Sequence, residues 1–221
     1  MSGEALRDLA GLLAALARGP AQASPPTATL PPAASVPVGV SGRHVHLSQA
    51  DLEALFGPGA RLTPLRELSQ PGQFAAEERV TLVGPKGVIQ HVRVLGPVRA
   101  RTQVEVLRGD TYRLGIKPCV RLSGHIDGTP GVTLVGPAGA VTLTEGVIVA
   151  ARHLHLSPEE AVGLGLRDGQ VVSLLCEGER PGRLDGVVVR ASGRGALDCH
   201  IDTEEANAFG LVNGSRLRLV V

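Results

Sequence analysis

The chain has 221 residues, and its 22 basic and 21 acidic side chains leave a formal net charge of +1. That balance argues against a general nucleic-acid or membrane-surface binder, whose affinity depends on concentrated positive charge. Aromatic residues make up 2% of the chain and Trp is absent, which argues against base-stacking platforms and predicts an aliphatic core.

The first 35 residues differ in composition from the rest of the chain. Leucines recur at three- and four-residue steps through residues 4–18, the spacing of an amphipathic helix, and Gly19-Pro20 ends that pattern. Residues 21–35 are rich in Pro, Ala, Ser and Thr, which predicts an extended linker. Two interpretations of the helix stay open: a docking peptide for a partner, or a helix that packs on its own domain or mediates oligomerisation.

Cysteine usage and the lack of targeting patterns indicate an intracellular protein. Cys119, Cys176 and Cys199 are an odd number without C-x-x-C spacing, so neither a disulfide framework nor a cysteine zinc site is expected. No apolar run approaches the ~20 residues of a membrane span. The N-terminus lacks the basic opening and long apolar block of a secretion signal, and we expect a cytoplasmic location.

From residue 36 onward, short β-branched runs alternate with turns that contain Gly and Pro, a pattern typical of small β-barrels or sandwiches. Three short helices are expected among them, in "SQADLEALFG", "SPEEAVGLGL" and "DTEEANAFGL". Ser48 and Ser157 are placed as N-caps of the first two helices, and Asp202 or Thr203 as N-cap of the third.

An internal duplication organises this part of the chain. "VSGRHVHLS" returns as "AARHLHLS", and "VTLVGPKG" returns as "VTLVGPAG". The sequence therefore predicts a mainly β fold of two small β-barrels capped by short α-helices. We assign residues 36–150 to the first repeat and 151–221 to the second, which would complete the other barrel together with the strand at 36–42.

The duplicated H-x-H pairs are candidate metal ligands. In an extended segment, side chains two residues apart point to the same side, so each pair aims two imidazoles at one ion while the residue between them enters the core. Four of the seven histidines lie in these two pairs, which favours a metal over surface histidines. The four are His44, His46, His153 and His155.

Two further residues could complete the ligand sets. His200 precedes the third predicted helix, in the same context as the H-x-H pairs, and Glu105 is the one acid in an otherwise uncharged strand. An outward-facing position for Glu105 is the alternative. His91 and His125 are weaker candidates. Nitrogen and oxygen donors without thiolate suit catalytic zinc, and copper, iron or cobalt also fit these donors.

Arg99 and Arg101 lie in "GPVRARTQVE", close to Glu105. Arginines beside a metal would bind a phosphate or carboxylate substrate, and a solvated pair near a turn is the alternative. Because no phosphate-binding glycine loop or nucleophile elbow is present in the sequence, phosphate chemistry would depend on metal and arginine.

These motifs together resemble the PduL-type phosphotransacylases, also called phosphate propanoyltransferases. The matching stretches occur in family order across residues 36–221. The resemblance implies two β-barrels with two zinc ions in a cleft between them. The stretches are "VPVGVSGRHVHLSQADLEALFG", "GPVRARTQVE", "SGHIDGTPG", "ARHLHLSPEEA" and "HIDTEEANAFG".

Carried over residue by residue, the resemblance implies two zinc-ligand sets and one phosphate ligand. "EVLRGDTYRLG" and Cys119 depart from the family pattern, which leaves the contacts to coenzyme A and between subunits unassigned. The first set is His44, His46 and Glu105, the second set is His153, His155 and His200, and the phosphate ligand is Arg99.

The implied reaction converts acyl-CoA and phosphate reversibly to acyl phosphate and CoA, with propanoyl-CoA or acetyl-CoA as substrate. We expect the zinc ion of the Glu105 set to take the CoA sulfur, and Arg99 with the second zinc ion to orient phosphate for direct attack in a ternary complex. Cys199, beside His200, is the alternative acyl acceptor, and we interpret it as a small core residue.

The resemblance also implies partners. Family members in bacterial microcompartments, such as those for propanediol degradation, carry an N-terminal helix and linker that direct them to the shell, and residues 4–18 resemble that arrangement. We also expect a homo-oligomer, either a dimer or larger. Two other functions compete with the main hypothesis: a zinc-dependent hydrolase of a thioester or amide, and a non-catalytic, cupin-like metal-binding module.

Overall fold

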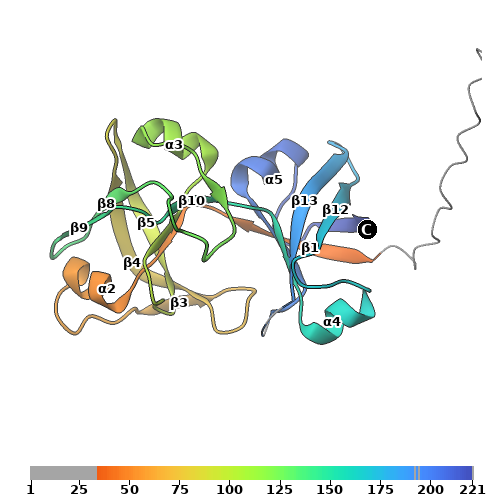
Figure 1. Ribbon diagram of the computed structural model, residues 1–221, viewed down its shortest axis with the longest axis horizontal. Helices are drawn as coiled ribbons and strands as arrows, with labels where there is room; N and C mark the ends of the chain where they lie inside the picture. The colour runs from red at the N-terminus through yellow and green to blue at the C-terminus, as the bar shows by residue number, and fades with distance from the viewer. Residues whose placement is uncertain (1–33, 192, 194, 221) are drawn as a thin grey trace, which may run out of the picture. The chain divides into compact units, whose positions relative to one another are not determined.

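A computed structural model describes residues 34–191, 193 and 195–220 (Figure 1). The predicted helix over residues 4–18 lies outside the described residues, as does nearly all of the predicted linker. Within the described part of the chain, no helix is both long enough and apolar enough to cross a membrane.

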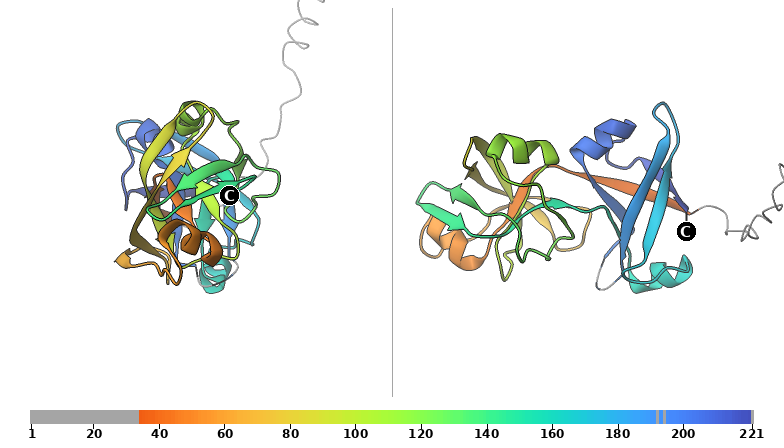
Figure 2. Two further views of the ribbon diagram at one scale, coloured as in Figure 1. Left: turned by 90° about the vertical axis from the view of Figure 1, so that its left-hand side faces the viewer. Right: turned by 45° about the horizontal axis from the view of Figure 1, so that its top comes forward.

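Six strands form a closed barrel, in the order β1-β14-β11-β13-β12-β15. The N-terminal strand β1 pairs in parallel with β14 and antiparallel with β15, so it belongs to the barrel built mostly from the second repeat (Figures 1 and 2). Helices α4 (Pro158–Gly163) and α5 (Thr203–Phe209) lie beside this barrel (Figure 1). The strands are β1 (Ser35–Ser41), β11 (His153–His155), β12 (Val171–Cys176), β13 (Gly182–Arg190), β14 (Asp198–Asp202) and β15 (Arg216–Val220).

The other nine strands form an open sheet, in the order β7-β10-β6-β2-β5-β4-β8-β9, with β3 paired to β4. Helices α2 (Gln49–Phe56) and α3 (Arg108–Leu114) contact this sheet. The strands are β2 (His44–His46), β3 (Pro64–Glu67), β4 (Phe74–Val83), β5 (Val88–Gly96), β6 (Gln103–Glu105), β7 (Val120–Arg121), β8 (Val132–Val135), β9 (Ala140–Leu143) and β10 (Val147–Ala150).

The fold class predicted from the sequence is confirmed, with one unit a closed barrel and the other an open half-barrel. Each unit has its own aliphatic core, dominated by Val and Leu, as the composition predicts. Val45 of β2 and Leu154 of β11, the residues between the paired histidines, are fully buried in these two cores. This packing holds both H-x-H strands in place.

The predicted N-caps are confirmed at all three helices that the sequence indicates. The side chains of Ser48, Ser157 and Asp202 each accept a hydrogen bond from the backbone N–H three residues later. Such a bond satisfies one of the N–H groups that a helix leaves unpaired at its start. Because each helix starts three residues after a candidate ligand, its cap fixes the direction in which the chain leaves the ligand strand.

Helix α3 is not predicted from the sequence. Its N-cap position holds Leu107, whose side chain cannot cap, and Gly109 in its first turn weakens the helical pattern. The carboxylate of Asp110 instead accepts the backbone N–H of Leu107 at 3.0 Å. Gly115 ends the helix with φ of 75°, a conformation that favours glycine.

Candidate metal and phosphate site

The first ligand cluster forms where β2 and β6 pair. His44 lies directly opposite Glu105 in the antiparallel register, and the side chains of His44, His46 and Glu105 are all buried. Their donor atoms lie within 4.8 Å of one another. Glu105 therefore faces inward beside the two imidazoles, and the alternative of an outward-facing strand residue is wrong.

The tautomer of His44 is set by the backbone. Its Nδ1 lies 2.9 Å from the carbonyl oxygen of Gly42, so Nδ1 carries a proton and donates it. In a neutral ring, the lone pair on Nε2 then points at Glu105 Oε2, which lies 3.5 Å away. Two acceptors facing each other are repulsive unless a proton or a metal cation lies between them.

The second ligand cluster forms where β11 and β14 pair. The ring centroids of His153, His155 and His200 lie 4.7–5.1 Å apart, and their donor atoms lie within 4.8 Å of one another. The Nδ1 of His153 donates to the carbonyl oxygen of Ala151 at 2.8 Å, which leaves Nε2 for the cluster. A Cβ on Gly39 would come within 2.8 Å of the His200 ring, so the cluster needs glycine there.

The two clusters occupy equivalent positions in the duplicated fold. β2 lies between a parallel strand, β5, and an antiparallel strand, β6. β11 likewise lies between parallel β13 and antiparallel β14. His44 pairs with Glu105 as His153 pairs with His200, so the carboxylate of one set and the third imidazole of the other are structural counterparts.

Burial sets the protonation of the imidazoles. Burial, with a smaller contribution from neighbouring imidazoles, lowers the pKa of His46 and His155 to about 3. Burial also lowers the pKa of His153 to about 4. These rings are therefore neutral at pH 7, and their lone pairs are available to a metal.

The charges of His44 and Glu105 depend on each other. Burial opposes the charge on both groups, but the attraction and hydrogen bond between them prevail. The pKa of His44 is raised and the pKa of Glu105 is lowered, so the carboxyl group is ionised at neutral pH. The first cluster thus combines a carboxylate and two imidazoles.

Arg99 lies near the first cluster, half-buried in the loop after β5. Its backbone N–H donates to the carbonyl oxygen of Leu47 at 2.9 Å, and its Nη1 donates to the Oγ of Ser123 at 3.1 Å. Burial lowers the pKa of Arg99, although the charge of Glu105 raises it. Arg101 points elsewhere and pairs with exposed carboxylates of Asp127 and Glu145, so the structure separates the two arginines.

Comparisons with known proteins identify the family of the chain. The family model described as phosphate propanoyltransferase matches residues 37–212. The chain belongs to the phosphate propanoyltransferase family. It is 55% identical over 184 residues to the phosphate propanoyltransferase of Rhodobacter capsulatus, which covers 83% of the chain and 86% of that relative. It is 52% identical over 184 residues to the enzyme of Thermotoga maritima (83% and 88%) and 49% identical over 179 residues to that of Salmonella typhimurium (80% and 85%).

As a member of the phosphate propanoyltransferase family, the chain is an acyltransferase enzyme with phosphate acyltransferase activity. This decides against the non-catalytic, cupin-like module. Transfer of an acyl group to phosphate involves an anionic nucleophile and a developing oxyanion. Cations at the two ligand clusters and the guanidinium of Arg99 would stabilise such charges.

Two residues that support the ligands were missed in the sequence analysis. Gln103 is buried, and its Nε2 donates to Glu105 Oε1 at 2.6 Å while its Oε1 accepts the backbone N–H of Gly124 at 2.7 Å. The Oδ2 of Asp198 lies 3.2 Å from His200 Nε2. Each lies two residues before a candidate ligand, so strand alternation could have placed it on the same face.

His91, His125 and Cys199 belong to neither ligand cluster. His91 and His125 are exposed and take part in neither donor cluster. Cys199 is fully buried among the apolar residues of the barrel core, and burial raises the pKa of its thiol to about 12. A thiol in that state is a poor nucleophile at neutral pH, as its interpretation as a core residue predicts.

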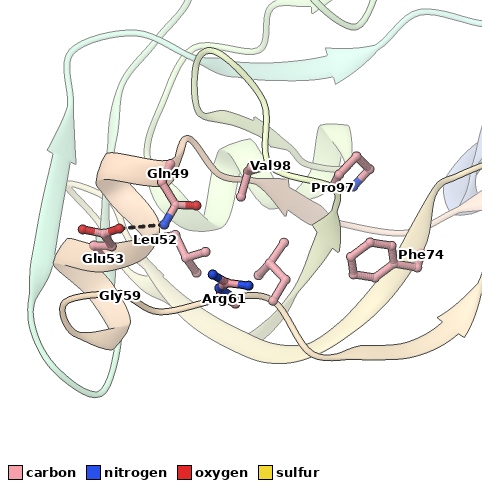
Figure 3. Close-up of a pocket in the computed structure, with 9 residues that line it drawn as sticks. Gln49, Leu52, Glu53, Gly59, Arg61, Phe74, Pro97 and Val98 are labelled. Carbon is pink, nitrogen blue, oxygen red and sulfur yellow. Dashed lines mark hydrogen bonds between the residues drawn. The ribbon is translucent and has the colours of Figure 1, made fainter.

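A cavity of about 460 Å³ lies beside α2 (Figure 3). Its lining contains none of the seven candidate site residues. Pro97 and Val98 form part of its wall and precede Arg99, so one loop contributes to the cavity and to the candidate phosphate site. The full lining is Gln49, Leu52, Glu53, Gly59, Arg61, Leu62, Phe74, Pro97 and Val98.

Proposed function

We propose that the protein transfers an acyl group from acyl-CoA to inorganic phosphate, reversibly giving acyl phosphate and CoA. The observation that supports this most strongly is the pair of three-donor clusters at equivalent positions of the duplicated fold, with a half-buried arginine near one of them. Propanoyl-CoA and acetyl-CoA are the substrates we propose, since the relatives are named for propanoyl transfer.

Two zinc ions per chain are the metals we propose. The donor chemistry fits, because neutral imidazoles and a carboxylate without thiolate suit zinc with a position left for substrate. The opposed lone pairs of His44 and Glu105 would gain a cation between them. The buried Nδ1 of His46 has no hydrogen-bond partner among the described residues, and buried polar atoms normally have one. A bound metal ion would explain why this ring is held without such a partner.

When bound, zinc at these clusters would supply Lewis-acid stabilisation of the thioester carbonyl and, at the Glu105 set, of the CoA sulfur. The residues of the chain position the reactants. Arg99 would bind phosphate through its guanidinium, held by the contacts of its backbone to Leu47 and of its side chain to Ser123.

The transfer we propose is direct. A phosphate oxygen attacks the carbonyl carbon, a carbon–oxygen bond forms, the carbon–sulfur bond breaks, and CoA leaves with the electron pair on sulfur. No covalent acyl-enzyme is needed, because Cys199 is in the barrel core.

We expect Cys199→Ala to keep turnover within about twofold of wild type while lowering the free energy of unfolding by roughly 1 kcal/mol. A folded variant without turnover would restore the acyl-enzyme hypothesis.

The test of the proposed function is release of CoA thiol from propanoyl-CoA by the purified, metal-loaded protein, with and without phosphate. We expect release that depends strictly on phosphate and is lost after chelation. Release that ignores phosphate would instead identify the competing zinc-dependent hydrolase. A series of acyl-CoA substrates would then define the preference between acetyl and propanoyl groups.

We also propose that the protein works in the cytoplasm as a homo-oligomer and that residues 4–18 direct it into a bacterial microcompartment. The amphipathic leucine spacing of that segment supports this proposal, and self-association is its competitor. Deletion of residues 1–20 should abolish co-purification with shells and leave the number of subunits in the oligomer unchanged. Fewer subunits per oligomer with retained shell association would favour the oligomerisation role.

A further inference from the structure

Arg190 ends strand β13, beside the second ligand cluster. It lies directly opposite His155 in the parallel register of β11 and β13. Its carbonyl oxygen accepts the backbone N–H of Leu156 at 3.1 Å, which fixes the strand end next to the ligand strand. Its side chain is half-buried, and its Nη1 reaches the carbonyl oxygen of Ser123 at 3.4 Å.

Two guanidinium groups thus converge on one residue from two different sheets. Arg99, in the loop after β5 of the open sheet, donates to the Oγ of Ser123. Arg190, from the closed barrel, donates to the carbonyl oxygen of the same residue. Ser123 therefore links an arginine near the first ligand cluster with an arginine beside the second.

Neither guanidinium has a carboxylate partner. Among the residues that the structure describes, no Asp or Glu oxygen lies within 4.0 Å of a side-chain nitrogen of Arg99 or Arg190. Some other arginines do have carboxylate partners, for example Arg101 with Asp127 and Glu145, and Arg152 with Glu205. Half-buried guanidinium groups without a carboxylate in direct contact are costly, and a bound anion would reduce that cost.

The charge of Arg190 acts on Arg99 and on the second ligand cluster. Burial is the main cause of the lowered pKa of Arg99, and the charge of Arg190 lowers it further. The same charge contributes to the lowered pKa of His153 and His155, after burial and neighbouring groups. The guanidinium of Arg190 is thus close enough to influence both Arg99 and the second ligand cluster.

We infer that Arg190 is a second phosphate-binding residue, which holds the attacking phosphate together with Arg99. This inference rests on the proposed function. One guanidinium pairs with at most two oxygens of a phosphate dianion, and a second guanidinium can pair with the others and balance the second negative charge. Because the two arginines come from different sheets, phosphate would be bound against both ligand clusters at once.

The experiment compares Arg190→Gln and Arg190→Lys with wild type, each loaded with metal, in initial rates over a range of phosphate and of propanoyl-CoA concentrations. Arg183→Gln is the matched control, because Arg183 lies in the same strand but is exposed and pairs with Asp185. Metal content is measured on every variant, so that loss of a ligand set is separated from loss of phosphate binding.

For Arg190→Gln we expect the KM for phosphate to rise roughly 10–100-fold, with the KM for propanoyl-CoA within about twofold and full metal content. Arg190→Lys should fall between Gln and wild type, because it keeps the charge without the bidentate fork. Calorimetric titration with inorganic phosphate, without CoA, should show the same order of affinities. Guanidinium ion should partly restore an Arg190→Ala variant.

An unchanged KM for phosphate in Arg190→Gln would overturn the inference. A rise confined to the KM for propanoyl-CoA would also overturn it, since Arg190 would then contact the phosphates of CoA. If Arg190→Gln does not fold, the Lys variant decides by the same two constants. Wild-type protein that releases CoA without phosphate would defeat the proposed function itself, an outcome independent of all the Arg190 variants.

Discussion

Gln103 holds the carboxylate of the candidate ligand Glu105 in place. It donates to Glu105 Oε1 and to Ser123 Oγ, and it accepts from the N–H of Gly124, so one buried amide holds the carboxylate and the loop that carries Ser123. Partners of this kind fix the orientation of metal ligands.

Gln103→Leu should therefore weaken metal binding at the Glu105 set by roughly 10–100-fold while the His153 set keeps its metal. Zinc titration with a competing chelator would measure the two affinities. Gln49→Leu, a change of an exposed glutamine on α2, is the control. Equal zinc affinities in Gln103→Leu and wild type would show that Glu105 does not depend on this amide.

His155 tests the second set at the level of one ligand. We expect His155→Ala to lose one metal ion per chain and nearly all turnover together, because two imidazoles hold zinc more weakly than three. The control is His91→Asn, an exposed position whose φ of 58° Asn tolerates and Ala does not. Full turnover with one ion fewer would contradict the model of two catalytic metal ions.

The three capped helices are the elements most directly encoded in the sequence. Ser157 accepts the N–H of Glu160 at 3.1 Å, and the carboxylate of Glu160 accepts the N–H of Ser157 at 2.8 Å. Both contacts are local, so the spacing of Ser and Glu predicts them before any tertiary structure is known.

Ser157→Ala should lower the free energy of unfolding by about 1 kcal/mol, because α4 loses a cap that satisfies a backbone N–H. Chemical denaturation of the metal-loaded protein would measure it. Glu159→Ala, in the same turn but outside the cap, should change the value by less than half as much. An equal effect of both substitutions would mean that α4 is stabilised by its charges and not by its cap.

Pairing between distant strands is what the sequence could not supply. Alternation places His44 and His46 on one face, and the structure agrees, but the register that sets Glu105 opposite His44 is a tertiary property. The same holds for Arg190, whose neighbour His155 comes from another strand of the barrel. The ligand and phosphate assignments and the domain boundaries stay predictions until they are tested.

At the scale of the whole molecule, the buried histidines make stability depend on pH. His46, His153 and His155 have a folded-state pKa of about 3, about 4 and about 3, against about 6.5 in an unfolded chain. Below pH 6.5 the unfolded chain takes up protons that the folded chain does not, so the free energy of unfolding decreases as the pH decreases. His44 acts in the opposite direction, because its folded-state pKa is raised.

Because three histidines have a lowered folded-state pKa and one has a raised pKa, the metal-free protein should lose stability as the pH falls from about 6.5 toward 4. Denaturation midpoints measured at steps of pH, with chelator present, would check this. A midpoint that stays constant or rises over that range would show that the rings are already protonated in the folded protein.

We propose that one site in this molecule joins phosphate to an acyl group taken from CoA. Phosphorus NMR of a reaction containing propanoyl-CoA, phosphate and the zinc-loaded protein tests it most directly, because acyl phosphate and inorganic phosphate give separate signals. We expect one acyl phosphate for every CoA released, and the loss of both products after chelation. CoA release without acyl phosphate would contradict it.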